Sequence, residues 1–168
     1  WLGPRYVIPC HHDDPSLPDI VAFRDRVTAD GSSGYPAASG RYHLYVSFAC
    51  PWAHRTLIYR KLKDLEDHIS ISVVNPLMRE HGWTFDPDRG VVPDPIGNAR
   101  YLHQVYTRAR PDYTGRVTVP VLWDRQQQRI VNNESAELIR ILNSAFDELT
   151  GSTLDLCPEP LRAEIDML

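Results

Sequence analysis

Apolar and polar residues alternate along positions 41–48, and this alternation is the first regular pattern in the chain. The apolar positions are Tyr42, Leu44, Val46 and Phe48. A period of two is typical of a β-strand. Over positions 52–65 the spacing becomes that of one helix face, with apolar residues at Ala53, Leu57, Ile58, Leu62 and Leu65. A second apolar run at 69–74 completes a predicted strand–helix–strand unit with parallel strands.

The second half of the chain predicts a helix, a strand hairpin and a last helix. A long loop over 75–98, which contains four prolines, comes first. Loops of this length in compact domains are usually functional or disordered. We expect a helix over 99–109, strands over 117–123 and 129–131 around a polar turn, and a helix from 132 to near Gly151.

The chain divides into three predicted segments. Residues 1–40 are an N-terminal extension, rich in proline and loop-forming residues, with a short strand or hairpin around Phe23 and Val27. Residues 41–151 form the main domain. Residues 152–168 predict a linker and the first turns of a further helix.

The composition of the chain argues against several classes of function. The 168 residues carry a formal net charge of −4 and no run of lysine and arginine, which argues against a nucleic-acid partner. No apolar stretch is long enough to span a bilayer, so no membrane partner is expected. Three widely spaced cysteines favour a reducing, cytoplasmic compartment over a disulfide framework. Because the chain starts at Trp1, a preceding targeting segment stays an open alternative.

The residue in the most informative position is Cys50, which follows the first predicted strand and opens the first predicted helix. Backbone N–H groups and the helix dipole favour an anion there, so the thiolate should form more readily than in a free cysteine. Pro51 suits the first helical turn, where its missing N–H has no partner. Ala53 stands where a second cysteine would resolve a disulfide. The sequence therefore predicts monothiol chemistry, and this order of elements resembles the thioredoxin fold, an α/β class.

Pro120 interrupts an apolar strand pattern and marks a second part of the candidate site. A proline removes a hydrogen-bond donor from a strand ladder, so base rates favour a proline with a trans peptide bond at the edge of a sheet. In thioredoxin-like domains a cis proline lies beside the active cysteine. The preceding residue, here Val119, can then offer its N–H and C=O to an extended peptide ligand.

Glu134 and Ser135 open the last predicted helix and form a third part. Backbone N–H groups and the Ser135 hydroxyl can hold a carboxylate, and Glu134 can accept from an α-amino group. Taken alone, helix capping by Asn132 or Asn133 explains this segment better. Combined with Cys50 and Val119, it forms a cradle suited to glutathione.

Two more residues extend this cradle. Arg116 precedes the predicted strand and can pair with the second carboxylate of such a ligand, or it is a solvated loop arginine. Trp83 lies in the long loop and can cover the ligand or a flat aromatic substrate, or it anchors the loop locally.

Other reactive side chains carry less weight. Residues 10–14 have metal-ligand chemistry, but adjacent residues rarely converge on one ion, so we expect a solvated tail and no metal. His54 lies four residues after Cys50, yet a side chain at the helix start points away from the next turn, so a Cys–His dyad is not expected. Cys157 has no reactive setting.

Four motifs together resemble the glutathionyl-hydroquinone reductases, the Xi class of the glutathione transferase superfamily, which is related to the omega class. They lie at 47–55 (SFACPWAHR), 82–85 (GWTF), 113–124 (YTGRVTVPVLWD) and 132–135 (NNES). The resemblance implies glutathione-dependent reduction of glutathionyl-hydroquinones. A catalytic thiolate, matching Cys50, takes the glutathionyl group as a mixed disulfide, and a second glutathione releases it as oxidised glutathione.

The resemblance also implies which residues contact glutathione and what else the family carries. The matching positions are Trp83, Arg116, Val117, Thr118, Val119, Glu134 and Ser135, supported by Pro51 and Pro120. Family members have a C-terminal all-helical domain that forms much of the aromatic pocket and the homodimer contact. The resemblance implies that this domain is missing after Leu168 and that hydroquinone specificity is impaired.

Three alternatives to the hydroquinone reductase stay open. One is an omega-like thiol transferase that reduces dehydroascorbate or protein–glutathione mixed disulfides. Another is a non-catalytic binding domain with an unreactive Cys50. The last is a cysteine hydrolase, which would need a base such as His54 beside the thiol.

Overall fold

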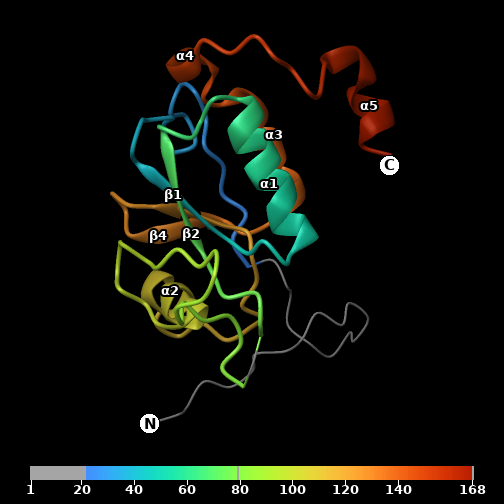
Figure 1. The fold of residues 1–168 in the computed structure, drawn as a ribbon. Coiled ribbons are helices and arrows are strands. Elements are labelled where there is room, and N and C mark those ends of the chain that lie inside the picture. Colours follow the sequence, from blue (N-terminus) through green and yellow to red (C-terminus); the bar gives the residue numbers. More distant parts are fainter. Residues whose placement is uncertain (1–21, 79, 168) are drawn as a thin grey trace.

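A computed structural model describes residues 22–78 and 80–167, in which four strands form one mixed sheet covered by helices (Figure 1). The elements in chain order are β1 (Tyr42–Val46), α1 (Pro51–Leu62), β2 (Ile69–Val73), α2 (Leu102–Ala109), β3 (Val121–Asp124), β4 (Arg129–Asn132), α3 (Ser135–Ser144), α4 (Asp147–Thr150), the 3-10 turn η1 (Glu159–Leu161) and α5 (Arg162–Ile165). The strand order is β2-β1-β3-β4. The thioredoxin-like arrangement expected from the sequence is confirmed.

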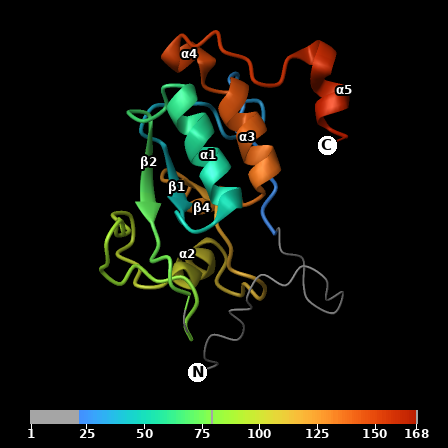
Figure 2. The same cartoon turned by 45° about the vertical axis from the view of Figure 1, so that its right-hand side comes forward.

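The fold is built around β1. This strand runs parallel to β2, with Tyr42 opposite Ile69, and antiparallel to β3, with Leu44 opposite Leu122. β4 extends the sheet antiparallel to β3. α1 and α3 lie side by side against the sheet (Figure 2), whereas α2 packs against β4. All five residues of β1 are buried, so the alternation in its sequence does not separate a buried face from an exposed one.

The strand predicted over 117–123 is shorter than expected, because β3 begins only after Pro120. Pro120 has no N–H to donate to a ladder. Before it, the Tyr106 hydroxyl accepts from the Thr118 N–H (3.2 Å) and donates to the Thr118 carbonyl oxygen (2.9 Å). A side chain thus replaces a neighbouring strand for this segment.

The predicted apolar face of the first helix is wrong in part. Ala53 and Thr56 are the buried residues of α1, whereas Ile58 and Leu62 are 45% and 47% exposed. The last predicted helix is divided into α3 and α4. It ends at Gly151 as expected, where a φ of +70° closes the helix in the left-handed conformation that glycine adopts readily.

Residues 22–40 pack into the same hydrophobic core as the main domain. Phe23, Val27 and Tyr35 are buried members of that core. The Phe23 carbonyl oxygen accepts from the Asn133 N–H (3.1 Å), and the Asp25 N–H donates to the Val131 carbonyl oxygen (3.0 Å). This segment therefore lies along β4 and contacts the start of α3.

The C-terminal residues are held to the domain by ion pairs. The buried Lys63 amino group pairs with Asp147 at 2.8 Å and also donates to the Leu154 carbonyl oxygen. Arg140 of α3 pairs with Asp166 beyond α5 at 2.5 Å. Among the helices of residues 22–78 and 80–167, none has the length and apolar character needed to cross a membrane.

A buried histidine joins β1 to β2. His43 Nε2 lies 2.9 Å from Ser72 Oγ, and Nδ1 lies 2.7 Å from Ser70 Oγ. Because the Ser72 hydroxyl donates to the Pro93 carbonyl oxygen (2.9 Å), it accepts from Nε2–H. In the neutral form of His43, Nδ1 then accepts from the Ser70 hydroxyl. Burial lowers the pKa of His43 to about 4, although the nearby Asp94 carboxylate opposes this shift.

We expect the protein to lose stability as the pH falls from 6.5 to about 4. The unfolded chain takes up a proton on His43 near its ordinary pKa of 6.5, whereas the folded protein does not until about 4. The loss is of order 3 kcal/mol across this window. Urea unfolding of the wild type and His43→Gln at pH 7.5 and 4.5 measures it. An equal pH dependence in both proteins would contradict the assignment.

Candidate functional site

Cys50 occupies the N-cap position of α1, with φ −101° and ψ 115°. The strand β1 ends at Val46, and Pro51 in the first helical turn fixes where the helix begins. The half-buried Cys50 side chain forms no capping hydrogen bond with its own helix. Its Sγ instead lies 3.6 Å from the Val119 carbonyl oxygen. The structure thus brings together the cysteine and the segment before Pro120, which are 69 residues apart.

The Val119–Pro120 peptide bond is cis. Successive residues of an extended segment turn their backbone groups in opposite directions. Because the groups of Thr118 point to the Tyr106 hydroxyl, those of Val119 point to the side of Cys50. Within residues 22–78 and 80–167, the Val119 N–H donates to no other group. This residue offers a donor and an acceptor to an extended ligand beside the thiol.

The start of α3 is joined to the Val119 segment through Asn133. The Asn133 side-chain amide lies 3.3 Å from the Tyr106 hydroxyl and 3.4 Å from Thr118 Oγ1. Glu134 is the N-cap of α3, and its carboxylate accepts from the Ala136 N–H at 2.9 Å. A side chain does cap this helix, but the predicted cap residues are wrong, because the N-cap is Glu134 and not Asn132 or Asn133. One oxygen of this carboxylate makes the capping bond, while the other has none in the described residues.

Arg55 is the residue of this site that the sequence interpretation missed. Its Nη2 donates to Ser135 Oγ at 2.5 Å and lies 3.9 Å from Glu134 Oε1. Its guanidinium carbon lies 5.0 Å from the ring centroid of Trp52. The available signal was a cation in the second turn of the helix that begins at Cys50. Nothing in the sequence placed that turn against the start of α3.

Arg116 lies immediately before the Val119 segment and is only 4% exposed. Its carbonyl oxygen accepts from the Tyr113 hydroxyl at 2.6 Å. Gly115 lies between them with a φ of +158°, and a Cβ there would meet the Tyr113 hydroxyl oxygen at 2.9 Å. In the described part of the chain, the buried Arg116 Nε has no hydrogen-bond partner, and no carboxylate pairs with the guanidinium. A buried cation without an anion is the chemistry expected of a carboxylate-binding group.

Trp83 is buried in the long loop between β2 and α2, in a segment that pairs with the residues around the start of α2. The Trp83 carbonyl oxygen accepts from the Leu102 N–H (2.9 Å), and the Phe85 N–H donates to the Arg100 carbonyl oxygen (2.8 Å). Within the described residues, no hydrogen bond joins Trp83 or Arg116 to Cys50. Their place in the site therefore stays a prediction.

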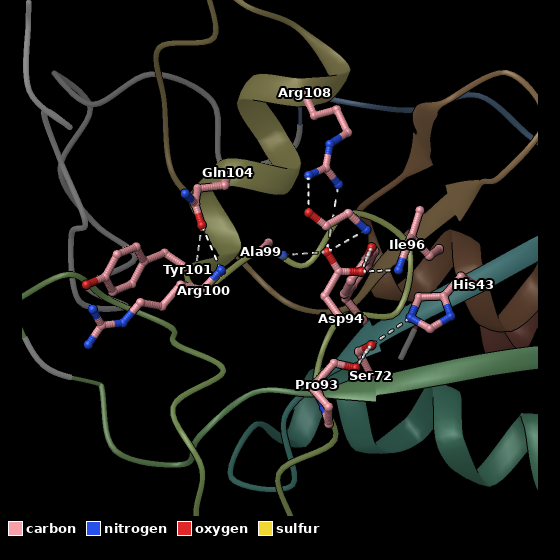
Figure 3. Close-up of polar contacts among 12 residues, drawn as sticks. His43, Ser72, Pro93, Asp94, Ile96, Ala99, Arg100, Tyr101, Gln104 and Arg108 are labelled. Carbon is pink, nitrogen blue, oxygen red and sulfur yellow. Dashed lines mark hydrogen bonds and ion pairs between the residues drawn. The ribbon is translucent and has the colours of Figure 1, made fainter.

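Asp94 fixes the second half of this loop (Figure 3). Its buried carboxylate accepts from the Tyr45 hydroxyl (2.9 Å) and from the N–H groups of Ile96 (2.9 Å), Gly97 (3.2 Å) and Ala99 (3.0 Å). Arg108 of α2 donates to the Gly97 carbonyl oxygen at 3.0 Å and approaches the carboxylate at 3.7 Å. Asp94 thus ties β1, the loop and α2 together.

The remaining candidate residues lie away from this site or outside the described chain. His54 is exposed, and its N–H makes the ordinary helical bond to the Cys50 carbonyl oxygen. Cys157 is buried near the C-terminal segment. Residues 10–14 lie outside the described residues. Within residues 22–78 and 80–167, no group of histidine, cysteine, aspartate and glutamate side chains is arranged to hold a metal.

A cysteine at the start of α1, a cis-proline segment beside it and the N-terminus of α3 are the arrangement of a thioredoxin-fold domain with a thiol site. Residues 49–145 match the family described as glutathione S-transferase, N-terminal domain. This match covers more than half of the chain, so the chain belongs to that family.

Individual relatives narrow the similarity to the Xi class. The chain is 59% identical over 136 residues to the glutathionyl-hydroquinone reductase PcpF of Sphingobium chlorophenolicum, covering 81% of this chain and 44% of that protein. The glutathione-bound structure of YqjG from Escherichia coli K-12 is 55% identical with a TM-score of 0.83, covering 86% of this chain and 50% of that one.

The Xi glutathione transferase of Phanerochaete chrysosporium is 49% identical with a TM-score of 0.84, covering 89% of this chain and 52% of that one. These similarities confirm the resemblance noted in the sequence. The chain spans about half the length of the curated relatives it matches.

Proposed function

We propose that this chain carries the glutathione site and the nucleophile of a glutathionyl-hydroquinone reductase. The observation that carries the proposal is the approach of Cys50 Sγ to the Val119 carbonyl oxygen at the N-terminus of α1. This places a nucleophile beside a backbone edge that can bind the cysteinyl part of glutathione. A reductase named for glutathionyl-hydroquinones is among the relatives, and another relative binds glutathione.

The other site residues supply groups for each end of glutathione. Glu134 and Ser135 at the start of α3 would hold the α-amino and α-carboxylate groups of the γ-glutamyl residue. Buried Arg116 would pair with the glycyl carboxylate. Trp83 would cover the ligand from the long loop, and residues 117 and 118 would support Val119.

The proposed reaction proceeds in two thiol-transfer steps. The Cys50 thiolate attacks the sulfur of the glutathionyl-hydroquinone, forms a disulfide with it and breaks its bond to the aromatic ring. The ring carbon takes a proton, so the hydroquinone is released reduced and the two sulfurs become oxidised. A second glutathione thiolate then attacks the Cys50–glutathione disulfide, which releases oxidised glutathione and restores the Cys50 thiolate.

This proposal extends to the setting of the whole protein. The mechanism consumes glutathione, and both cysteines of the described residues are free thiols, which favours a reducing cytoplasmic compartment. The resemblance to the Xi class favours a second, all-helical domain and a homodimer in the full-length protein. Neither a metal nor another cofactor takes part in the proposed steps.

The first step is tested by intact mass measurement of this chain after incubation with a glutathionyl-hydroquinone and no free glutathione. We expect one added glutathione, equimolar release of hydroquinone, and no adduct with Cys50→Ser. An adduct that forms with oxidised glutathione but not with the glutathionyl-hydroquinone would favour the thiol transferase. Absence of an adduct from both donors would contradict any catalytic role of Cys50 in this chain.

We expect Arg116→Met to weaken glutathione binding without destabilising the protein. The substitution removes a charge–carboxylate interaction, which should raise the dissociation constant by about 10-fold or more. It also replaces a buried unpaired cation by an apolar side chain of similar length, so the free energy of unfolding should stay equal or rise. Calorimetric titration and urea unfolding measure both quantities. Arg89→Met, an exposed arginine in the loop, is the control.

A further inference from the structure

Arg55 links the helix that carries Cys50 to the start of α3. Its Nη2 lies 2.5 Å from Ser135 Oγ, and the two residues are 80 positions apart in the chain. The Trp52 ring, one helical turn earlier, lies under the guanidinium at 5.0 Å. Glu134 Oε1 lies 3.9 Å from the same Nη2. The guanidinium is thus held between α1 and α3 by three different groups.

The direction of the hydrogen bond between Arg55 and Ser135 is fixed by chemistry. A guanidinium has only donors, so Ser135 Oγ must accept. The hydroxyl keeps its single proton, for which no acceptor is found within residues 22–78 and 80–167. Ser135 is buried and is the first residue of α3, where helical N–H groups also lack intrahelical acceptors. Its proton and the Ser135 N–H, which has no acceptor among the described residues, can donate to an anion, whereas the Ala136 N–H already donates to the Glu134 carboxylate.

We propose that Arg55 is a positioning residue that orients the Ser135 hydroxyl to donate to the γ-glutamyl α-carboxylate of glutathione. This inference rests on the proposed function. A charged donor bonded to Oγ also polarises the hydroxyl, which strengthens the hydrogen bond that it donates. Arg55 therefore acts through Ser135 and need not contact the ligand.

The test is a double-mutant cycle with two ligands, in full chains that also carry Cys50→Ser to prevent disulfide exchange. The variants are Arg55→Gln, Ser135→Ala and the double variant. The ligands are glutathione and 4-aminobutyryl-cysteinyl-glycine, which lacks only the α-carboxylate. Calorimetry gives each dissociation constant. Lys61→Gln is the control, because it removes an exposed cation from the same helix.

We expect each single variant to weaken glutathione binding about 10-fold and the double variant to be no weaker than Ser135→Ala. Binding of the analogue should change less than 2-fold in every variant, and Lys61→Gln should match the parent.

Four results would overturn the inference. If the fold-changes of the two single variants in the glutathione dissociation constant multiply in the double variant, Arg55 acts independently of Ser135. Equal weakening of both ligands would show that Arg55 only maintains the fold. A parent chain that binds neither ligand would refute both the proposed function and this inference. A parent chain that binds both ligands, together with variants that bind them equally well, would refute this inference alone.

Discussion

Replacing Cys50 by serine should abolish turnover and slightly stabilise the protein. Removal of the proposed covalent nucleophile should cost at least about 1,000-fold in rate, because no base among the described residues contacts Sγ of Cys50 and could ionise a serine hydroxyl there. Cys50 is the N-cap of α1 but makes no capping bond. Serine in this extended conformation is a preferred N-cap, so the free energy of unfolding should rise by about 0.5–1 kcal/mol.

Steady-state reduction of a glutathionyl-hydroquinone and thermal unfolding measure the two effects. Cys50→Ala is the matched control, because it removes the thiol without supplying a cap. It should be equally inactive and no more stable than the wild type. Turnover by Cys50→Ser within 10-fold of the wild type would show that another group is the nucleophile.

The parts of the site that the sequence could predict depend on short-range patterns. The Cys50-Pro51 pair marks a helix start through local chemistry, and the periods of 2 and 3.6 locate the strands and helices on either side. The parallel βαβ unit and the hairpin follow from the same patterns. The contact between Cys50 and Val119 could be predicted only from the whole fold, and the order of strands and helices in the sequence indicated that fold.

The parts that the sequence could not predict depend on contacts between distant segments. Arg55 meets Ser135 only because α1 and α3 pack side by side. Ile58 and Leu62 have helical spacing, but the face of α1 that meets α3 and the sheet is centred on Ala53 and Thr56. Spacing alone cannot tell which apolar face a neighbouring element covers.

The long loop shows the same limit most clearly. Its length and prolines predicted irregular structure, and the structure agrees. The order of its second half depends on one carboxylate, Asp94, which accepts from three backbone N–H groups and the Tyr45 hydroxyl. The sequence does not indicate which of the several aspartates in this polar segment is buried and bonded to the loop backbone.

Asp94→Ala should destabilise the protein by about 3–5 kcal/mol and weaken glutathione binding. The substitution leaves buried donors without an acceptor and Arg108 without its partner. A cost of this size is a large fraction of the stability of a small domain. The loop then loses its attachment to β1, and with it the support for the strand-like contact that positions Trp83. Urea unfolding and hydrogen exchange of residues 83–101 measure the two consequences.

Asp88→Ala is the matched control, because among the described residues the carboxylate of this exposed aspartate of the same loop accepts only from the adjacent Arg89 N–H. Its effect should stay within about 0.5 kcal/mol. Equal exchange rates at residues 83–101 in Asp94→Ala and the wild type would contradict the role of Asp94.

The pH dependence of the wild type gives an independent check on Asp94. Burial acts to raise the pKa of Asp94, but hydrogen bonds from the Ala99 and Ile96 N–H groups and the Tyr45 hydroxyl outweigh burial and hold it below 3.8. A lowered pKa in the folded state contributes stability above 3.8 that is lost as the pH falls through the folded value. This loss lies below the His43 window of 6.5 to 4. The free energy of unfolding should therefore fall in two separate pH ranges, and only the lower fall should disappear in Asp94→Ala.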